Sequence, residues 1–376
     1  MPLSRRALLR HVTATAVIAA GSPRLNASAA PGPPAPVGDG SIRLDSNENP
    51  FGPSEHAVAA MQRAADLSAR YPAAYVDLLR DAIAAHHAVA SGQVMVSPGS
   101  GAIIRAAATT LVGPAKTAVM GSPGFPLFAE SVAYAGARLA AVPLTKAHAH
   151  DLDAMLAAVD GDTRLVYVCN PNNPTGSLTR RTDLDRFLEA VPSGTYVLVD
   201  EAYHHFVGGS ADYASLIGRA SLRPRTIVTR TFSAVYGLAG LRIGYAVADP
   251  ETVRLLRAGG LSDAVTVAGA MAAVAALADQ EHVRRCVKRN ADIRQEFFNQ
   301  ANARMLRAID SHTNFVLLDT QRATDDIGDH FRRHGILIAA PAADLRRYIR
   351  VSLGTEEEMQ RFWRVWDLLP MAQMSM

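Results

Sequence analysis

The alternation of short apolar segments with helix-length amphipathic segments, from residue 117 onward, is the feature that most constrains the fold. The apolar segments are Thr117–Met120, Arg138–Val142, Arg164–Cys169, Tyr196–Val199, Thr226–Thr229 and Ile243–Val247. Segments with helical periodicity between them include Leu127–Ala135, Leu152–Val159 and Thr182–Val191. Such alternation is typical of parallel strands joined by helices that cover both faces of one sheet. We therefore expect an α/β domain with a largely parallel sheet.

The pattern changes after Asp249 and Pro250, where a second domain is expected. A helix rich in small residues is predicted over Ala264–Ala278, followed by a long charged helix over Glu281–Ala303. The remaining elements expected are short strands near Asn314–Leu318 and Tyr348–Ser352 and a terminal helix from Glu356. This order predicts a smaller α+β domain. The segment 264–278 is shorter than the roughly 20 apolar residues that cross a bilayer, so no membrane span is expected.

Composition excludes several classes of function. The chain has 376 residues, of which 49% are apolar and 19% charged, as in an ordinary globular protein of two domains. Its net charge is only +3, and no dense basic patch with interleaved aromatic residues predicts nucleic-acid binding. Cys169 lies in an apolar segment and Cys286 in a charged helical one, so neither a disulfide nor a metal site is expected.

The first 37 residues have the character of a leader and linker. Arg5 and Arg6 precede a modest apolar stretch, Val12–Ala20, and small residues at 27–29 suit a signal peptidase. The apolar stretch is too short to span a membrane. We expect export by the twin-arginine route, which carries folded proteins, to the periplasm or the extracellular space. The alternative is a cytoplasmic protein whose N-terminal tail has a chance Arg-Arg pair.

Polar residues follow two of the predicted strands directly. Asp200 follows Tyr196–Val199, and the segment Asn170–Gly176, with the sequence Asn-Pro-Asn-Asn-Pro-Thr-Gly, follows the strand that ends at Cys169. Ligands of open α/β sheets bind beyond the carboxyl ends of the strands. Two prolines and a glycine fix a loop that can hold the Asn173 amide against a ligand. A helix-capping Asp200 and an ordinary turn are the alternatives.

A glycine-rich segment is a candidate phosphate cradle. Ser97-Pro-Gly-Ser-Gly-Ala102 precedes a predicted helix, Ile103–Leu111. Glycines let backbone N–H groups approach an anion, and a helix N-terminus adds a partial positive charge. The motif is common, so on its own it is weak support for phosphate binding.

The segment Thr231–Tyr245, with the sequence Thr-Phe-Ser-Ala-Val-Tyr-Gly-Leu-Ala-Gly-Leu-Arg-Ile-Gly-Tyr, resembles the active-site segment of class I/II pyridoxal-phosphate (PLP) aminotransferases. The histidinol-phosphate aminotransferase branch is the most similar. The resemblance extends over residues 41–370, in about seven blocks that include the motifs above and Tyr348–Thr355. It implies the PLP-dependent transferase fold type I, with a mostly parallel seven-stranded sheet in a large domain and a smaller α+β C-terminal domain. The boundaries expected are a leader and linker over 1–37, an N-terminal arm over 38–55, a large domain over 56–250 and a small domain over 251–376.

The resemblance also implies which residues bind PLP. Asp200 would pair with the pyridine nitrogen, Asn173 and Tyr203 would bind the ring hydroxyl, and Phe125 would stack on the ring, unless it is simply a core residue. The residues implied for the phosphate are Ser100, Gly101, Ala102, Thr231, Ser233 and Arg242. Tyr71 resembles the tyrosine that reaches the phosphate from a partner subunit, which implies a homodimer.

The substrate implied is an amino acid/2-oxo acid pair. Arg350 resembles the family arginine that clamps the substrate carboxylate through its planar fork, although an arginine beside a strand can also be a surface charge. Asn49, in the N-terminal arm, is the arm residue expected nearest the substrate. Asn314 matches another family segment of the small domain.

One position departs from the family. The lysine that carries PLP as a Schiff base is expected at position 234, and the chain has Ala234 there. Loss of a positioned acid–base group typically costs about 10²–10⁴ in rate, and the covalent step is lost as well. Three hypotheses stay open: an aminotransferase into which alanine was introduced, a native protein that binds PLP or a PLP–amino acid adduct without transamination, and a PLP enzyme with another base, such as His204 or His205.

Overall fold

The computed structural model describes residues 40–260, 264–322, 324–339 and 345–370. The predicted twin-arginine leader lies outside these residues and remains a prediction. Within the described part of the chain, no helix combines the length and the apolar character needed to cross a membrane.

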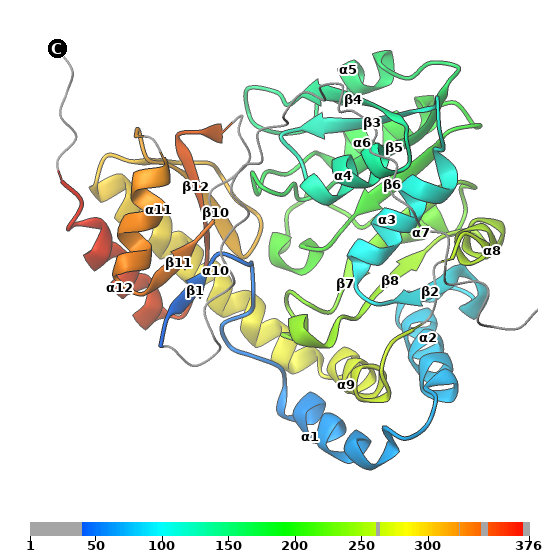
Figure 1. The fold of residues 1–376 in the computed structure, drawn as a ribbon, viewed down its shortest axis with the longest axis horizontal. Coiled ribbons are helices and arrows are strands. Elements are labelled where there is room, and N and C mark those ends of the chain that lie inside the picture. Colours follow the sequence, from blue (N-terminus) through cyan, green and yellow to red (C-terminus); the bar gives the residue numbers. More distant parts are fainter. Residues whose placement is uncertain (1–39, 261–263, 323, 340–344, 371–376) are drawn as a thin grey trace, which may run out of the picture. The chain divides into compact units, whose positions relative to one another are not determined.

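The central element is a seven-stranded sheet, with the strand order β2-β8-β7-β6-β5-β3-β4 (Figure 1). Its strands are β2 (Val94–Ser97), β3 (Thr117–Ser122), β4 (Arg138–Pro143), β5 (Thr163–Cys169), β6 (Tyr196–Asp200), β7 (Thr226–Thr231) and β8 (Gly244–Val247). β8 runs antiparallel to both of its neighbours, and β3 to β7 are paired in parallel. The predicted mostly parallel seven-stranded sheet is therefore confirmed.

Helices cover both faces of this sheet, and each face has its own hydrophobic core. The helices on one face are α1 (Glu55–Ala64), α2 (Ala73–His87), α5 (Leu152–Ala157), α6 (Arg181–Ala190), α7 (Ile217–Ala220) and α9 (Val267–Ala278). Those on the other face are α3 (Ser100–Leu111), α4 (Pro126–Tyr134) and α8 (Pro250–Ala258). Because both faces are covered, the central strands are apolar throughout, as the sequence pattern indicated.

Side-chain caps fix where many of these helices begin. Ser54, Asp151, Asp249 and Thr266 each accept a hydrogen bond from a backbone N–H in the first turn of the following helix. Such caps satisfy donors that a helix N-terminus leaves without partners, which stabilises the helix by about 1 kcal/mol.

The C-terminal region forms a smaller α+β layer. Its strands are β9 (Arg307–Ala308), β10 (Phe315–Asp319) and β12 (Tyr348–Ser352) in an antiparallel sheet, and β1 (Ile42–Leu44), which pairs in parallel with β11 (Ile336–Ile338). Its helices are α10 (Gln280–Ala303), α11 (Thr324–Arg333) and α12 (Glu356–Trp366). Leu44 of the N-terminal arm is buried in the core of this layer. The arm is thus anchored to the C-terminal part of the chain.

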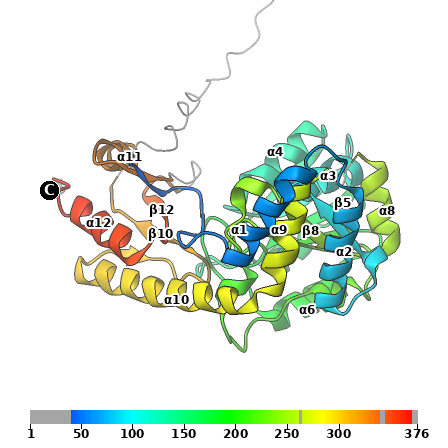
Figure 2. The same cartoon turned by 90° about the horizontal axis from the view of Figure 1, so that it is seen from below.

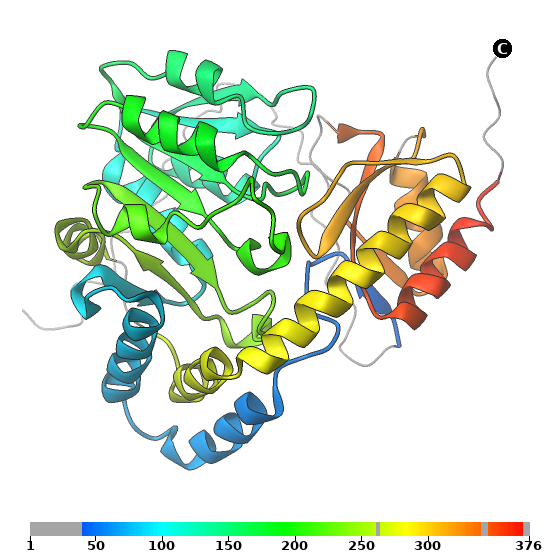
Figure 3. The same ribbon diagram turned by 180° about the vertical axis from the view of Figure 1, so that it is seen from behind.

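Helix α10 is shared by the two layers (Figures 2 and 3). Its first half buries Val283 and Cys286 in a core of the large sheet, and its second half buries Ile293 and Phe297 in the core of the small layer. Helix α8, which begins at residue 250, and helix α9 also pack on the large sheet, although the small domain was expected from residue 251. The domain boundaries given above remain predictions.

His150 is a buried titratable residue behind the loop that follows β5. Its Nε2 contacts the Cys169 carbonyl oxygen at 2.9 Å, whereas its buried Nδ1 has no hydrogen-bond partner. Burial lowers the pKa of His150 to about 4, and the hydrogen bond to Cys169 offsets only part of this shift. The folded protein therefore keeps this imidazole neutral well below the pH at which an exposed imidazole takes up a proton.

We predict that His150 contributes to acid destabilisation. The unfolded chain binds a proton here near pH 6.5 and the folded chain near pH 4, so this group's contribution to stability is complete above pH 6.5. As the pH decreases from 6.5 to 4, the stabilising contribution of His150 falls by up to about 1.4 kcal/mol per pH unit. Urea unfolding of wild type and of His150→Gln at several pH values will reveal a shallower pH dependence in the variant. Parallel pH dependences of the two proteins would contradict the prediction.

Candidate active site

The site lies where the carboxyl ends of the parallel strands meet at one edge of the large sheet. β6 ends at Asp200, β5 leads into Asn170–Gly176, and β7 ends at Thr231. β2 is antiparallel to β8, as β7 is, so it also ends at this edge and leads into Gly99. The parallel topology therefore brings together segments that lie far apart in the sequence.

Asp200 is a buried carboxylate held by neutral donors. Tyr167 donates its hydroxyl to Oδ2 at 3.1 Å, while the Thr229 hydroxyl and the Ala202 backbone N–H donate to Oδ1, each at 3.1 Å. Burial raises the pKa of Asp200 to about 6, and these hydrogen bonds oppose the rise. A cationic partner would favour the ionised form, so the site suits a protonated ring nitrogen.

Tyr203 and Asn173, the residues expected at the ring hydroxyl, contact each other. The Tyr203 hydroxyl accepts hydrogen bonds from Asn47 Nδ2 at 2.9 Å and from Asn173 Nδ2 at 3.4 Å. Burial raises the pKa of Tyr203 to about 12, so the phenol stays protonated and can donate to an acceptor. Its ring meets the ring of Phe315 edge-on at 5.0 Å.

Arg350 reaches the same cluster from β12. Its Nη1 donates to Asn173 Oδ1 at 3.1 Å and its Nη2 donates to the Asp45 carbonyl at 2.6 Å. The buried Nε has no hydrogen-bond partner. A buried donor without a partner costs about 1–3 kcal/mol, so an anionic ligand would be favourable here. The surface-charge alternative for Arg350 does not fit this burial.

A second cluster forms the expected phosphate end. Arg242 lies two residues before β8, and its Nη1 contacts Ser233 Oγ at 3.3 Å. The Ser233 N–H donates to Thr231 Oγ1 at 3.0 Å. A Cβ atom on Gly99 would collide with the Arg242 guanidinium, and one on Gly244 would collide with the backbone nitrogen of Ser100. The two glycines thus permit a close approach of the α3 N-terminus to the arginine.

The first turn of α3 completes this end. Ser100, Gly101 and Ala102 are its first three residues and are half-buried. Their N–H groups include orphan donors of the helix N-terminus, which favour an anion. Arg242 has a backbone φ of 54°, an uncommon conformation for a residue other than glycine. Such conformations cluster at functional sites.

Strand β7 connects the two clusters. Thr229 bonds to Asp200, and Thr231 bonds to Ser233. Residues two apart in a strand point to the same face and lie roughly 6.6 Å apart along it. A flat ligand with an anionic group at one end and a ring nitrogen at the other therefore matches the spacing of the sheet.

Position 234 is buried and carries only a methyl group. Ala234 is 4% exposed, and its carbonyl accepts the Gly237 N–H at 3.0 Å. The chain's lysines are Lys116, Lys146 and Lys288. Lys116 pairs with Asp162, Lys288 pairs with Asp292, and Lys146 is exposed in a loop, so none occupies the position of an active-site amine.

Asn49 lies beside this position, at the N-terminal arm. Its Nδ2 donates to the Val235 carbonyl at 2.8 Å and lies 3.5 Å from Cys286 Sγ. A second arm residue, Asn47, which the resemblance did not single out, enters the Tyr203 cluster. Asn314 holds the arm through the Asn47 carbonyl at 2.9 Å.

Two predicted residues have no direct bond to the clusters. Phe125 is half-buried and packs on a core beside α4. Its loop is tied to the 170–176 loop, because Asn172 Nδ2 donates to the Pro123 carbonyl at 3.1 Å. Tyr71 is 96% exposed. Its expected role needs a second subunit, so the isolated chain leaves that role a prediction.

His204 and His205 do not join the clusters around Tyr203. His204 Nδ1 contacts the Tyr213 hydroxyl at 2.9 Å, and His205 Nε2 contacts the Tyr236 hydroxyl at 3.3 Å. Burial and the charge of Arg230, which is itself paired with buried Glu201, lower the pKa of His205 to about 3 and that of His204 further still. These contacts do not favour either histidine as a replacement base.

The family follows from comparison with known proteins. A model of the family "Aminotransferase class I and II" matches residues 39–365. Histidinol-phosphate aminotransferase of Bacillus licheniformis is 35% identical over 322 residues, with 85% of this chain and 89% of the relative covered. Histidinol-phosphate aminotransferase 1 of Nitrosococcus oceani is 36% identical over 329 residues, with 87% and 88% covered.

The chain belongs to the class I and II aminotransferase family.

Solved structures agree with this assignment. A histidinol-phosphate aminotransferase from Sinorhizobium meliloti, in complex with pyridoxal-5'-phosphate, has a TM-score of 0.81 at 31% identity, with 87% of this chain and 92% of that chain covered. A putative histidinol-phosphate aminotransferase from Erwinia carotovora atroseptica has a TM-score of 0.84 at 29% identity, with 88% and 96% covered. The aminotransferase-like chain thus has the fold type I of PLP-dependent enzymes, as predicted.

We predict that Gly99→Ala abolishes phosphate binding at the second cluster, because the added methyl displaces the Arg242 guanidinium. Gly113→Ala is the matched control, since Gly113 also has a positive φ but has open space around its Cβ position. Inorganic phosphate should raise the Tm of wild type and of Gly113→Ala and leave that of Gly99→Ala unchanged. Equal Tm increases in both variants would show that phosphate binds elsewhere.

Proposed function

We propose that this aminotransferase-like chain binds PLP without a covalent link, together with an amino acid or 2-oxo acid, and that transamination is impaired. The observation that carries the proposal is the pairing of an intact polar site with Ala234. Hydrogen bonds connect Asn173 to both Tyr203 and Arg350, and Asp200 lies three residues before Tyr203. Position 234, in contrast, has no amine.

The residues present fit PLP. Asp200 is a buried carboxyl without a cationic partner among its hydrogen-bond donors, and it suits a pyridine nitrogen. Gly99 and Arg242 leave a cradle that a Cβ atom would fill, and it suits a phosphate. Bound PLP would act as an electron sink for an amino acid substrate.

The side chains divide the remaining tasks. Arg350 would hold the substrate carboxylate through its fork, with its unpartnered Nε as an additional donor. Asp200 would hold a proton at the ring nitrogen, and Tyr203 and Asn173 would donate to an oxygen of the ring. All four side chains bind and orient, and these tasks do not need residue 234.

Ala234 removes the tasks that need an amine. A lysine would anchor the cofactor and carry a proton at the reacting carbon. Its absence removes both the covalent step and a positioned acid–base group, and the latter alone typically contributes about 10²–10⁴ in rate. Binding is therefore expected to survive while turnover is slow.

The second candidate is a binding or regulatory protein with no turnover. It is favoured by the same observation, because the polar contacts that hold a ligand do not depend on position 234. A PLP enzyme with another base is less well supported, since His204 and His205 engage Tyr213 and Tyr236 instead.

We further propose a homodimer in which Tyr71 of one protomer reaches the site of the other. Tyr71 is 96% exposed and Leu78, on the following helix α2, is 61% exposed. Contiguous exposed apolar patches mark surfaces that another chain covers, but single exposed apolar side chains are normal, so the resemblance of Tyr71 to the family tyrosine is the main support. The dimer would complete the phosphate end of the site.

We predict that Ala234→Lys restores covalent attachment of PLP. After incubation with PLP and reduction with borohydride, the variant should gain the mass of one pyridoxyl phosphate, located by peptide mapping at position 234, and wild type should gain none. Ala90→Lys, which introduces a lysine at an exposed position, is the control and should remain unlabelled.

Two results would count against this proposal. If wild type is labelled at one native lysine, that lysine serves the site and the assignment of position 234 is wrong. If neither wild type nor Ala234→Lys binds PLP by equilibrium dialysis, the site does not accept the cofactor.

We predict that Tyr71→Ala weakens PLP binding by about 10- to 100-fold, the loss expected for one hydrogen bond to a charged group. Tyr134→Ala, which removes another exposed tyrosine (85%), should leave the affinity unchanged. Light scattering will give the mass of both variants. A monomeric wild type whose PLP affinity is insensitive to Tyr71→Ala would rule out the shared site.

A further inference from the structure

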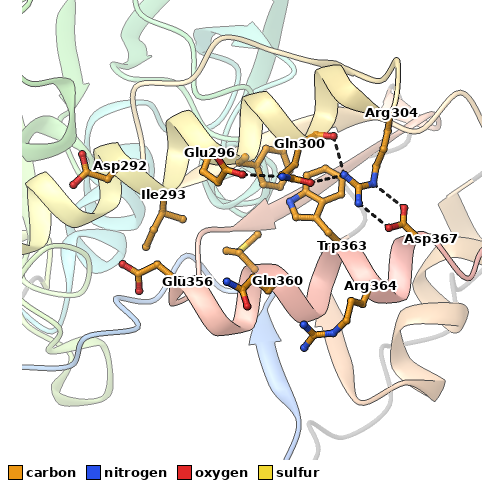
Figure 4. A pocket seen from close by; sticks show the side chains of 12 residues that line it. Asp292, Ile293, Glu296, Gln300, Arg304, Glu356, Gln360, Trp363, Arg364 and Asp367 are labelled. Atoms are coloured by element: carbon orange, nitrogen blue, oxygen red, sulfur yellow. Dashed lines mark hydrogen bonds and ion pairs between the residues drawn. The ribbon is translucent and has the colours of Figure 1, made fainter.

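A groove on the small layer, away from the clusters described above, has the features of a second ligand site. It lies between α10 and α12 and encloses about 560 Å³ (Figure 4). Small-molecule sites typically have volumes of about 300–1,000 Å³. Its apolar floor consists of Ile293, Phe297, Met359 and Trp363.

Trp363 brings an unpartnered donor to this floor. Its side chain is 5% exposed, and its buried indole Nε1 has no hydrogen-bond partner. In Figure 4 the nitrogen faces the space between the two helices, on the side of Ile293. A buried donor left without an acceptor costs about 1–3 kcal/mol. This nitrogen has almost no accessible surface, so an oxygen acceptor of a ligand reaches it only when a neighbouring side chain of the groove shifts, and the bond then removes that cost.

One end of the groove is already occupied by the chain's own ion pair. Arg304 donates from Nε and Nη2 to the two carboxylate oxygens of Asp367, each at 2.7 Å. Its Nη1 donates to the Gln300 side-chain oxygen at 2.6 Å, and its guanidinium lies 4.8 Å from the centre of the Trp363 ring. With these donors committed, Arg304 is not available to an anionic ligand. Arg364, the other arginine that lines the groove, lies at this same end, on α12 and away from the acidic residues (Figure 4).

The other end is acidic. Asp292 and Glu356 lie there, one on each helix, and Glu296 lies between them and Gln300, whose Nε2 donates to Glu296 Oε1 at 2.8 Å (Figure 4). Lys288 pairs with Asp292 at 2.8 Å and Arg289 with Glu356 at 3.5 Å, but all four side chains are more than half exposed. Exposed ion pairs of this kind are weak, so a ligand cation can compete for the carboxylates.

We propose that this groove binds a small organic ammonium ion that has an apolar body and a neutral oxygen acceptor. The acceptor would bond to Trp363 Nε1, the body would lie over Ile293 and Met359, and the ammonium would face Asp292, Glu296 and Glu356. Carboxylate ligands, including free amino acids, are disfavoured because three carboxylates line the open end. The proposal concerns a site separate from the PLP site and does not depend on the proposed function.

The chain provides its own reporter for this groove. Trp363 and Trp366 are its only tryptophans, and both lie on α12. In the Trp366→Phe protein, tryptophan fluorescence and the single indole N–H resonance therefore report on Trp363 alone. Titration of the purified full-length chain with phenylalaninamide, without added PLP, should give a saturable change in both signals.

Ligand analogues and protein variants separate the contributions of the ammonium group and of the acidic side chains to binding. N-acetylphenylalaninamide lacks the ammonium and phenylalanine adds a carboxylate, so both should bind at least about tenfold more weakly. The double variant Asp292→Asn, Glu296→Gln should weaken phenylalaninamide binding by about tenfold, as expected for two exposed charge pairs. The double variant Glu281→Gln, Glu357→Gln removes the same number of negative charges, one from α10 and one from α12, outside the groove, and it should bind as wild type does.

Trp363→Phe tests the donor itself, with calorimetry as the readout and far-UV circular dichroism as the folding check. The affinity for phenylalaninamide should fall about five- to tenfold, the loss expected for one hydrogen bond, because the phenyl ring keeps the apolar contacts. The proposal is overturned if no saturable signal develops at millimolar phenylalaninamide. It is also overturned if the three ligands or the two double variants bind alike, because binding would then be apolar and unselective.

Discussion

The hydrogen bonds around the Tyr203 phenol are the interactions on which the arrangement of the site depends. They join Asn47 of the arm and Asn173 of the loop after β5, and Asn173 in turn holds Arg350 of β12. Ser352 of the same strand donates to Asn47 Oδ1 at 3.1 Å. Arm, large sheet and small layer therefore meet through a few short polar contacts. Such buried networks specify one arrangement, because any shift leaves donors without acceptors.

Much of the fold and site was predictable because periodicity and strand-end motifs are local signals. Asp200 and Asn173 lie where parallel strands must deliver them, whereas Arg242 reaches the same edge at the start of the antiparallel strand β8. The antiparallel direction of β8 was not predictable, since an apolar run carries no direction. Asn47 was missed as a site residue because its role depends on a contact 156 positions away in sequence. Tyr167 and Thr229 were missed for the same reason, since they sit in ordinary apolar strand patterns.

Under the proposed function, Ala234 would separate ligand binding from turnover. The residues that orient a ligand come from several strands and the arm, and they bond mainly to one another. Residue 234 contributes no side-chain bond to that network, so its replacement leaves the surrounding geometry intact. The same independence explains why the family resemblance is strong across the chain although position 234 has no amine. The retained polar side chains support ligand binding. Turnover depends on the side chain at position 234.

The continuity of α10 has a mechanical consequence. Its 24 residues span roughly 36 Å as an unbroken rod. Cys286, near one end, touches the arm residue Asn49, and Arg304, just past the other end, is clamped to α12. A rigid rod cannot tilt at one end without moving the other. Motions of the arm and of the outer surface of the small layer should therefore be correlated, with the helix acting as a lever between them.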